Sequence, residues 1–96
     1  MKYQVQENCL TIFLPTELDH HNAEEIRKNA DSLIEEHQIK CVIFDFADTN
    51  FMDSSGIGVI IGRSRIMQFR GGKVVAIRMG KRVNMLFHSA GLEKIV

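Results

Sequence analysis

Hydrophobic and polar positions alternate near the start of the chain, and this alternation predicts two strands. Residues 3–6 and 9–14 both follow the pattern, with the polar pair Glu7-Asn8 between them. Successive strand side chains point to opposite faces, so a period of two gives each strand one dry and one wetter face. We therefore expect a β-hairpin that ends at Pro15, which cannot donate into a strand ladder.

A helical period replaces the alternation after a loop over residues 16–21. Apolar residues fall at positions 23, 26, 30, 33 and 34, which is the spacing of one helix face. Asn22 and Glu25 stand three residues apart, as the two members of a capping box do. The pattern predicts a helix from Ala23 to about His37.

Residues 41–46 form a short apolar run rich in β-branched and aromatic side chains, which is typical of a buried central strand. A polar turn follows, and then a second helical period over residues 55–69 that Gly71-Gly72 should end. Val59 and Ile66 lie off the expected core stripe of this helix. That stripe consists of Ile57, Ile60, Ile61, Ser64 and Met67.

The rest of the chain adds a strand over residues 73–78 and a helix over 81–89 closed by Gly91. Ile95-Val96 should begin a last edge strand. The order ββαβαβα with a terminal β fragment predicts one α/β domain built on a mixed sheet. Crossovers between parallel strands are almost always right-handed, and successive crossovers in one direction place the helices mainly on one face.

Composition fits a single soluble domain. The chain has 96 residues, of which 45% are hydrophobic and 25% charged, and no apolar run approaches the ~20 residues that span a bilayer. We expect a cytoplasmic protein without a membrane partner. Cys9 and Cys41 each fall in a strand pattern without a neighbouring ligand at metal spacing, so we expect free thiols in the core, no metal and no cofactor.

The net charge of zero conceals an uneven distribution. Residues 1–48 hold four Lys or Arg against ten Asp or Glu, and residues 49–96 hold eight against two. The two halves either interleave and neutralise one another, which we favour, or create a dipolar surface that orients a charged partner.

The turn Asp53-Ser54-Ser55-Gly56 carries the candidate chemistry. Aspartate and serine oxygens cap helix starts by accepting hydrogen bonds from unpaired backbone N–H groups, so a serine hydroxyl should lie near the surface at the positive end of a helix.

Several enzyme motifs fail on spacing. Gly56, Gly58 and Gly62 do not give the dinucleotide fingerprint. They fit close backbone packing better, within the fold or against a partner, with Gly58 the expected contact residue. Ser54 lies outside a G-x-S-x-G elbow, and the adjacent histidines His20-His21 suit a solvated loop better than a metal or a general base.

Two segments carry a resemblance to a known family. Residues 16–24, TELDHHNAE, and residues 51–63, FMDSSGIGVIIGR, are similar to the STAS-domain anti-sigma factor antagonists, above all to the sporulation members. The likeness extends to the Gly71-Gly72 turn and to residues 86–92. It departs at Thr16, where the family usually has glycine. Members of the family have a C-terminal helix after the last strand. We expect residues 1–96 to form a STAS domain without this helix.

The resemblance implies a binding protein and not an enzyme. The unmodified form would bind an anti-sigma factor, itself an ATP-dependent serine kinase, and so release a sigma factor. Phosphorylation of Ser54 would end binding, and a serine phosphatase would reverse the modification. The expected contact surface joins the loop to the turn and consists of Glu17, Asp19, His20, Asp53, Ser54, Ser55, Gly56 and Gly58, with the exposed side of the second helix.

Two other functions compete with this interpretation. Seven cations in the second half suggest a nucleic-acid-binding domain, but only Phe69 offers an aromatic platform among them, and no known motif frames them. They are Arg63, Arg65, Arg70, Lys73, Arg78, Lys81 and Arg82. A small hydrolase using Ser54 would need a base within hydrogen-bond reach, which the sequence does not indicate. We therefore expect no nucleic-acid partner.

Overall fold

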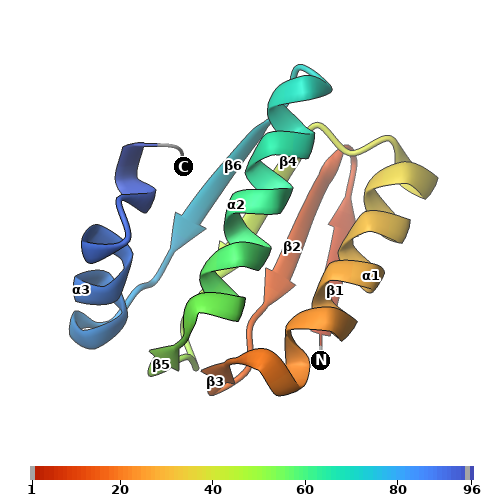
Figure 1. The fold of residues 1–96 in the computed structure, drawn as a ribbon. Helices are drawn as coiled ribbons and strands as arrows, with labels where there is room; N and C mark the ends of the chain where they lie inside the picture. Colours follow the sequence, from red (N-terminus) through yellow and green to blue (C-terminus); the bar gives the residue numbers. More distant parts are fainter. Residues whose placement is uncertain (1, 95) are drawn as a thin grey trace.

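The computed structural model describes residues 2–94 and 96, and Figure 1 shows their arrangement. The elements in chain order are β1 (Lys2–Gln6), β2 (Cys9–Phe13), β3 (Glu17–Leu18), α1 (His20–His37), β4 (Cys41–Asp45), β5 (Phe51–Met52), α2 (Ser54–Phe69), β6 (Lys73–Ile77), α3 (Lys81–Ser89) and a 3₁₀ turn η1 (Leu92–Lys94).

The main sheet has the strand order β1-β2-β4-β6. The hairpin pairs β1 and β2 antiparallel, with Tyr3 opposite Ile12. β2 and β4 run parallel, as do β4 and β6, so Val42 stands between Leu10 and Val74. The predicted mixed sheet is therefore confirmed, and β4 lies in its interior.

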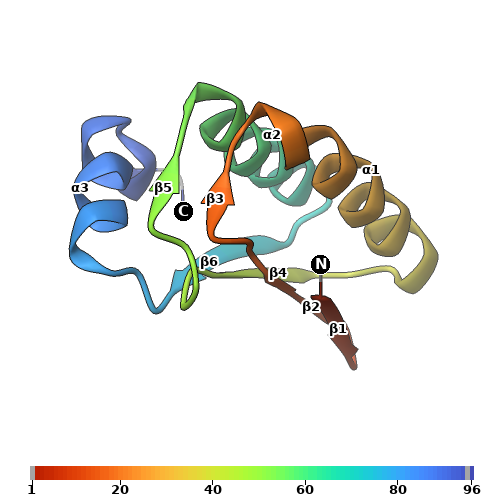
Figure 2. The same cartoon turned by 90° about the horizontal axis from the view of Figure 1, so that it is seen from below.

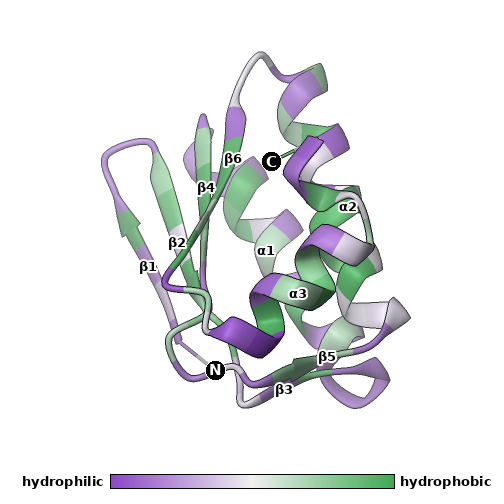
Figure 3. Ribbon diagram, turned by 90° about the vertical axis from the view of Figure 1, so that its left-hand side faces the viewer, coloured by the Kyte–Doolittle hydropathy of each residue, from purple (hydrophilic) through white to green (hydrophobic). Residues whose placement is uncertain are grey.

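Helices α1 and α2 pack side by side over one face of this sheet, and α3 lies beyond β6 (Figures 1 and 2). Their apolar residues form one core with those of the inner strands, and Figure 3 colours the hydrophobic residues along these elements green. Leu10, Ile12, Phe44 and Ile60 are fully buried there. In the described part of the chain no helix covers the opposite sheet face, which explains why Ile43 in the middle of β4 is only half-buried.

The first helix begins earlier than the periodicity predicts. Asp19 is its N-cap, and its side chain accepts a hydrogen bond from the His21 N–H at 3.0 Å. The Asn22 side chain accepts in return from the Asp19 N–H at 3.1 Å. The capping box is thus Asp19 with Asn22, and the predicted pair of Asn22 with Glu25 was wrong. The first turn is polar, so hydrophobic spacing could not locate it.

The buried face of α2 also differs from the predicted stripe. Val59 is buried, whereas Ile57 and Ile61 are only partly buried. Arg63 is buried as well, at 5% exposure, because α1 packs along this side of α2. Ile60, Ser64 and Met67 are buried as predicted.

The sequence gives no sign of the second sheet, in which β3 pairs parallel with β5. Glu17 stands opposite Phe51 and Leu18 opposite Met52. Each strand has only two residues, too few for any period to appear. The pair nevertheless fixes the approach to both α1 and α2 (Figure 2).

The C-terminal prediction is tested only in part. The predicted edge strand begins at Ile95, which lies outside the described residues, and Val96 is not in a strand. Before it, η1 follows α3 directly and buries Leu92.

Candidate partner-binding corner

Asp53 caps α2 and holds its first turn. One carboxylate oxygen, Oδ1, accepts hydrogen bonds from the Ser55 and Gly56 N–H groups at 2.8 and 3.1 Å. The backbone of Asp53 is extended, as the capping position requires. Asp53 is therefore the N-cap, and Ser54 is the first residue of the helix.

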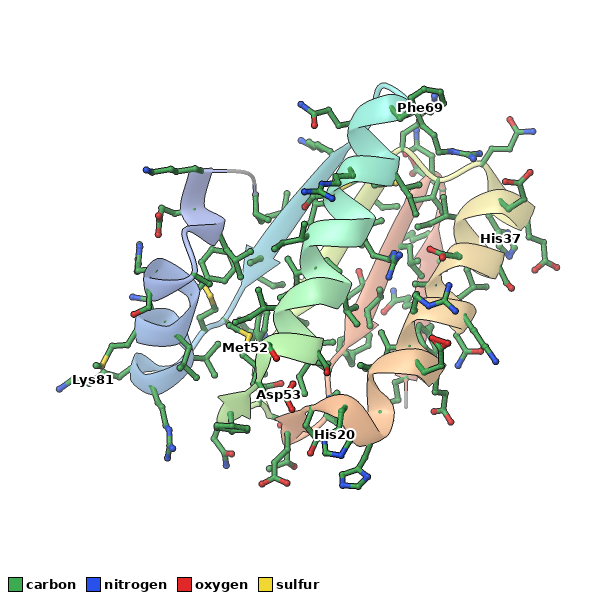
Figure 4. The ribbon with its side chains drawn as sticks, viewed as in Figure 1. His20, His37, Met52, Asp53, Phe69 and Lys81 are labelled. Atoms are coloured by element: carbon green, nitrogen blue, oxygen red, sulfur yellow. The ribbon has the colours of Figure 1, made fainter. Side chains whose placement is uncertain are left out.

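The second oxygen of Asp53 connects this corner to α1. Oδ2 accepts from the His20 N–H at 3.2 Å, and the His20 ring Nδ1 lies 3.7 Å away. Next to this contact, the Asp53 N–H donates to the Leu18 carbonyl at 3.2 Å. One carboxylate thus joins the starts of both helices, and Figure 4 labels the side chains of Asp53 and His20 at these two starts.

The pKa of Asp53 lies below its ordinary value. Desolvation alone would raise this pKa, but the backbone N–H groups of Gly56, His20 and Ser55 donate to the ionised form and outweigh that effect. The corner therefore carries a stable negative charge at neutral pH.

The two serines of the turn differ in exposure. Ser54 is exposed at the first position of α2, whereas Ser55 is half-buried and its N–H is held by Asp53. A partner can reach the hydroxyl of Ser54 without disturbing the cap.

Gly56, and not Gly58, is the contact glycine. Gly56 is buried, and a Cβ there would overlap the Leu18 carbonyl and stand 2.8 Å from the Leu18 Cγ. A Cβ at Gly58 would meet nothing within 4 Å. Within the fold, the expectation that Gly58 makes the close approach was wrong, because the unforeseen strand β3 lies under Gly56. A contact of Gly58 with a partner stays a prediction.

The structure brings the predicted contact residues to one corner of the molecule. Glu17, His20, Ser54 and Gly58 are exposed there. The side chains of Asp19 and Asp53 are engaged in capping, and Gly56 is buried. The residues that remain available to a partner are thus a subset of those predicted. That a partner uses them stays a prediction.

The geometry does not favour hydrolysis or metal binding. Both oxygens of Asp53 accept from backbone N–H groups, so this carboxylate acts as a helix cap and not as the orienting member of a triad. Among the described residues no group of three His, Cys, Asp or Glu could hold a metal ion. Nor is any helix in residues 2–94 long and apolar enough to cross a membrane.

The opposite charges of the two halves pair across the fold. Arg63 lies 2.9 Å from Asp31, Arg70 3.2 Å from Glu35, and Arg78 hydrogen-bonds to Asp45 at 3.1 Å. Each pair joins a cation of the second half to an anion of the first. Three of the seven candidate nucleic-acid contacts are therefore engaged within the protein.

Sequence reasoning missed a recess between α1 and α2 beside this corner. It has a volume of about 280 Å³, and both helices contribute to its walls. Arg27 and Arg63 line it with Ser55 and Gly58. The interruption of the apolar stripe of α2 by Arg63 was the available signal.

The chain matches the STAS domain family over residues 1–96. Among curated proteins, an anti-sigma F factor antagonist of Paenibacillus polymyxa is 34% identical over 87 residues, which cover 91% of this chain and 74% of that protein. One from Lysinibacillus sphaericus is 31% identical over 88 residues, covering 92% and 75%. An anti-sigma-B factor antagonist of Bacillus subtilis is 27% identical over 90 residues, covering 94% and 81%.

Solved structures agree in fold. The anti-sigma factor antagonist SpoIIAA in its unphosphorylated form superimposes with a TM-score of 0.86 at 31% identity, covering 98% of this chain and 84% of that one. The phosphorylated form of the Bacillus cell fate determinant SpoIIAA gives 0.77 at 30% identity, covering 98% and 87%. The fold, the matched length and these identities agree with the resemblance seen in the sequence. The chain belongs to the STAS domain family.

Proposed function

We propose that this protein is an anti-sigma factor antagonist. In its unmodified form it binds an anti-sigma factor that is also an ATP-dependent serine kinase, and the sigma factor is released. Phosphorylation of Ser54 by that kinase ends the association, and a serine phosphatase restores it. The names of the curated relatives and the solved phosphorylated form of SpoIIAA support this proposal.

The observation that carries the proposal is the separation of cap and acceptor at the corner. Asp53 holds the helix start, while Ser54 beside it is exposed. Phosphorylation adds about −1.5 to −2 charge at a serine. The helix dipole accommodates an anion at this end, so the fold tolerates it. A docked partner would instead meet two neighbouring negative groups, the phosphate on Ser54 and the carboxylate of Asp53.

A regulator of this kind needs no catalytic residue, cofactor or metal of its own. The relatives are named as antagonists of another protein, in accord with the expectation that the chain is not an enzyme. That it is a kinase substrate belongs to the proposal. The proposal places it in the cytoplasm with protein partners alone.

The experiment is incubation with the candidate anti-sigma kinase and ATP, followed by mass spectrometry and binding measurements. We expect one phosphate, on Ser54, and loss of the complex as it accumulates. Ser54→Ala should bind the kinase and stay bound, whereas Ser54→Asp should bind poorly.

Ser55→Ala is the matched control, since it changes a neighbouring hydroxyl in the same turn. It should be phosphorylated like the wild type. Phosphate found on Ser55, Ser64 or Ser89 would refute the acceptor assignment. Tight binding by Ser54→Asp would refute the switch.

A further inference from the structure

The recess between α1 and α2 opens beside the exposed serine of the corner. His20, Ala23, Glu24 and Arg27 line it from α1, and Ser55, Gly58, Val59 and Arg63 line it from α2. Gly58 leaves its mouth open, because this residue has no side chain and a Cβ there would have free space around it. Its volume of about 280 Å³ can admit a protein side chain.

Arg63 lies in the wall of this recess with an unused donor. The residue is only 5% exposed. Its Nε lies 2.9 Å from Asp31 Oδ1, a close ion pair without the alignment of a hydrogen bond. The Nη1 group is buried and has no hydrogen-bond partner among the described residues. Buried donors without an acceptor are costly, and an arginine fork is shaped to bind carboxylate or phosphate.

The other charged side chains around the recess have partners within the protein. Arg27 holds Glu24 through two hydrogen bonds of 2.7 and 2.8 Å and also lies 3.8 Å from Asp31. His20 lies against Asp53. Burial, followed by the charge of Arg27, lowers the pKa of Arg63, and the opposing effects of Asp31 and Glu24 do not fully offset the cost of holding this charge away from water. An additional anion next to Arg63 would correct that deficit.

We propose that this recess is an acceptor site for one acidic side chain of the protein partner, whose carboxylate binds Arg63 between α1 and α2. The assignment rests on the proposed function for the identity of the partner, an anti-sigma factor. The anion preference of the recess rests only on this chain. Because Ser55 lines the recess and Ser54 precedes it, a phosphate on Ser54 would repel the incoming carboxylate as well as the partner's outer surface.

The anion preference is tested without any partner. The probe is N-acetyl-glutamate amide, which carries one side-chain carboxylate, with N-acetyl-glutamine amide as the neutral control. We expect saturable NMR shifts of the Ser55 and Gly58 amides and of the Arg63 Nε–H group at millimolar concentrations of the acidic probe. Equal shifts with the neutral probe, or no shifts at all, would overturn the proposal.

Substitutions then localise the site. Arg63→Gln should abolish the shifts, whereas Lys28→Gln removes the same charge from an exposed position of α1 outside the predicted contact surface and should keep them. Since Arg63→Gln removes the closer of the two ion pairs of Asp31 and can lower stability, Gly58→Leu provides a second test by filling the mouth of the recess. Gly62→Leu is its control, because a Cβ at Gly62 also meets nothing within 4 Å and Gly62 does not line the recess.

The identity of the occupant is tested by measuring how tightly each variant binds the anti-sigma factor. Arg63→Gln and Gly58→Leu should each weaken binding about tenfold or more, the usual scale for losing a buried charge-assisted contact. Lys28→Gln, which lies on α1 outside the predicted contact surface, should leave the affinity within about twofold of the wild type. Probe binding combined with unchanged partner affinity in both recess variants would overturn the assignment of the occupant. If instead wild-type protein bound no anti-sigma factor, the proposed function would fail while the probe result stood.

Discussion

The carboxylate of Asp53 accepts the backbone N–H of His20 at 3.2 Å, so the cap of one helix also holds the start of another. His20 and Asp53 are separated by 33 residues in sequence. The relationship makes the corner a single unit whose two halves cannot move independently, and it gives the first prediction.

Replacing Asp53 by alanine should lower the melting temperature by several degrees, because two helix starts lose their acceptor together. Asparagine should recover most of the loss, since it caps nearly as well as aspartate. The pKa of Asp53 is depressed in the folded protein. Its charge therefore stabilises the fold above the pKa of an unfolded aspartate, and that contribution disappears as the pH falls through the folded value. Thermal unfolding from pH 7 down to about pH 3 should show a smaller decline for Asp53→Asn than for the wild type.

Alanine at Gly56 should destabilise the protein by about 1–3 kcal/mol, as overpacking of a close contact does. The added methyl would overlap the backbone of Leu18. Alanine at Gly58 is the matched control and should be neutral or stabilising by up to about 1 kcal/mol, because alanine favours a helix over glycine. Urea unfolding measures both, and equal effects would contradict the packing role of Gly56.

Aspartate at position 54 should leave the melting temperature close to that of the wild type. Ser54 is the first residue of α2 and not its cap, so the substitution removes no capping contact. The favourable helix dipole and repulsion by Asp53 act in opposite directions on the new charge. Calorimetry of Ser54→Asp beside Ser54→Ala checks this, and a drop of many degrees would show that a phosphate strains the fold.

Arg78→Gln should destabilise the protein at neutral pH and much less in acid. Asp45 is 3% exposed, and the hydrogen bonds from Arg78 hold its pKa below the usual range. A depressed folded pKa means that stability is gained above the unfolded pKa and is lost as the pH falls. The difference in unfolding free energy between variant and wild type, measured by urea titration, should therefore be smaller at about pH 3 than at pH 7. A difference independent of pH would exclude this ion pair as the cause.

Amide hydrogens of β4 should exchange much more slowly than those of β1. β4 is bonded on both sides within the sheet, whereas β1 is an edge strand with β2 as its neighbour. Exchange followed by NMR separates the two, since interior strands open only with larger unfolding events. Faster exchange at Val42 and Phe44 than at Tyr3 would contradict the placement of the core.

How much of the structure can be predicted from the sequence depends on how far apart along the chain the interacting residues lie. The hairpin and β4 are predictable because a short alternation and a short apolar run each indicate how a strand is buried, and the extent of α2 is predictable because its helical period and the glycines after it are local signals. The start of α1 was missed because Asp19 caps a turn with polar residues only. Val59 and Arg63 were misplaced because the buried side of α2 depends on where α1 lies, which no local pattern records.

The candidate site divides in the same way. Asp53, Ser54 and Gly56 are visible in sequence as a cap, a hydroxyl and a small residue. That His20 shares the same carboxylate follows only from the tertiary fold. The recess at Arg63 leaves only one mark in the sequence, the arginine within the apolar pattern of α2, because its two walls come from separate helices.

The parallel pairing of β3 with β5 makes the corner a product of long-range assembly. Glu17 pairs with Phe51 across a segment of chain that contains α1 and β4. Closing such a loop costs chain entropy that later contacts must repay, so the corner should form late in folding. A kinase that reads both strands would therefore modify finished molecules and pass over incomplete ones. Under the proposed function, this small sheet would thus restrict phosphorylation to completely folded copies of the protein.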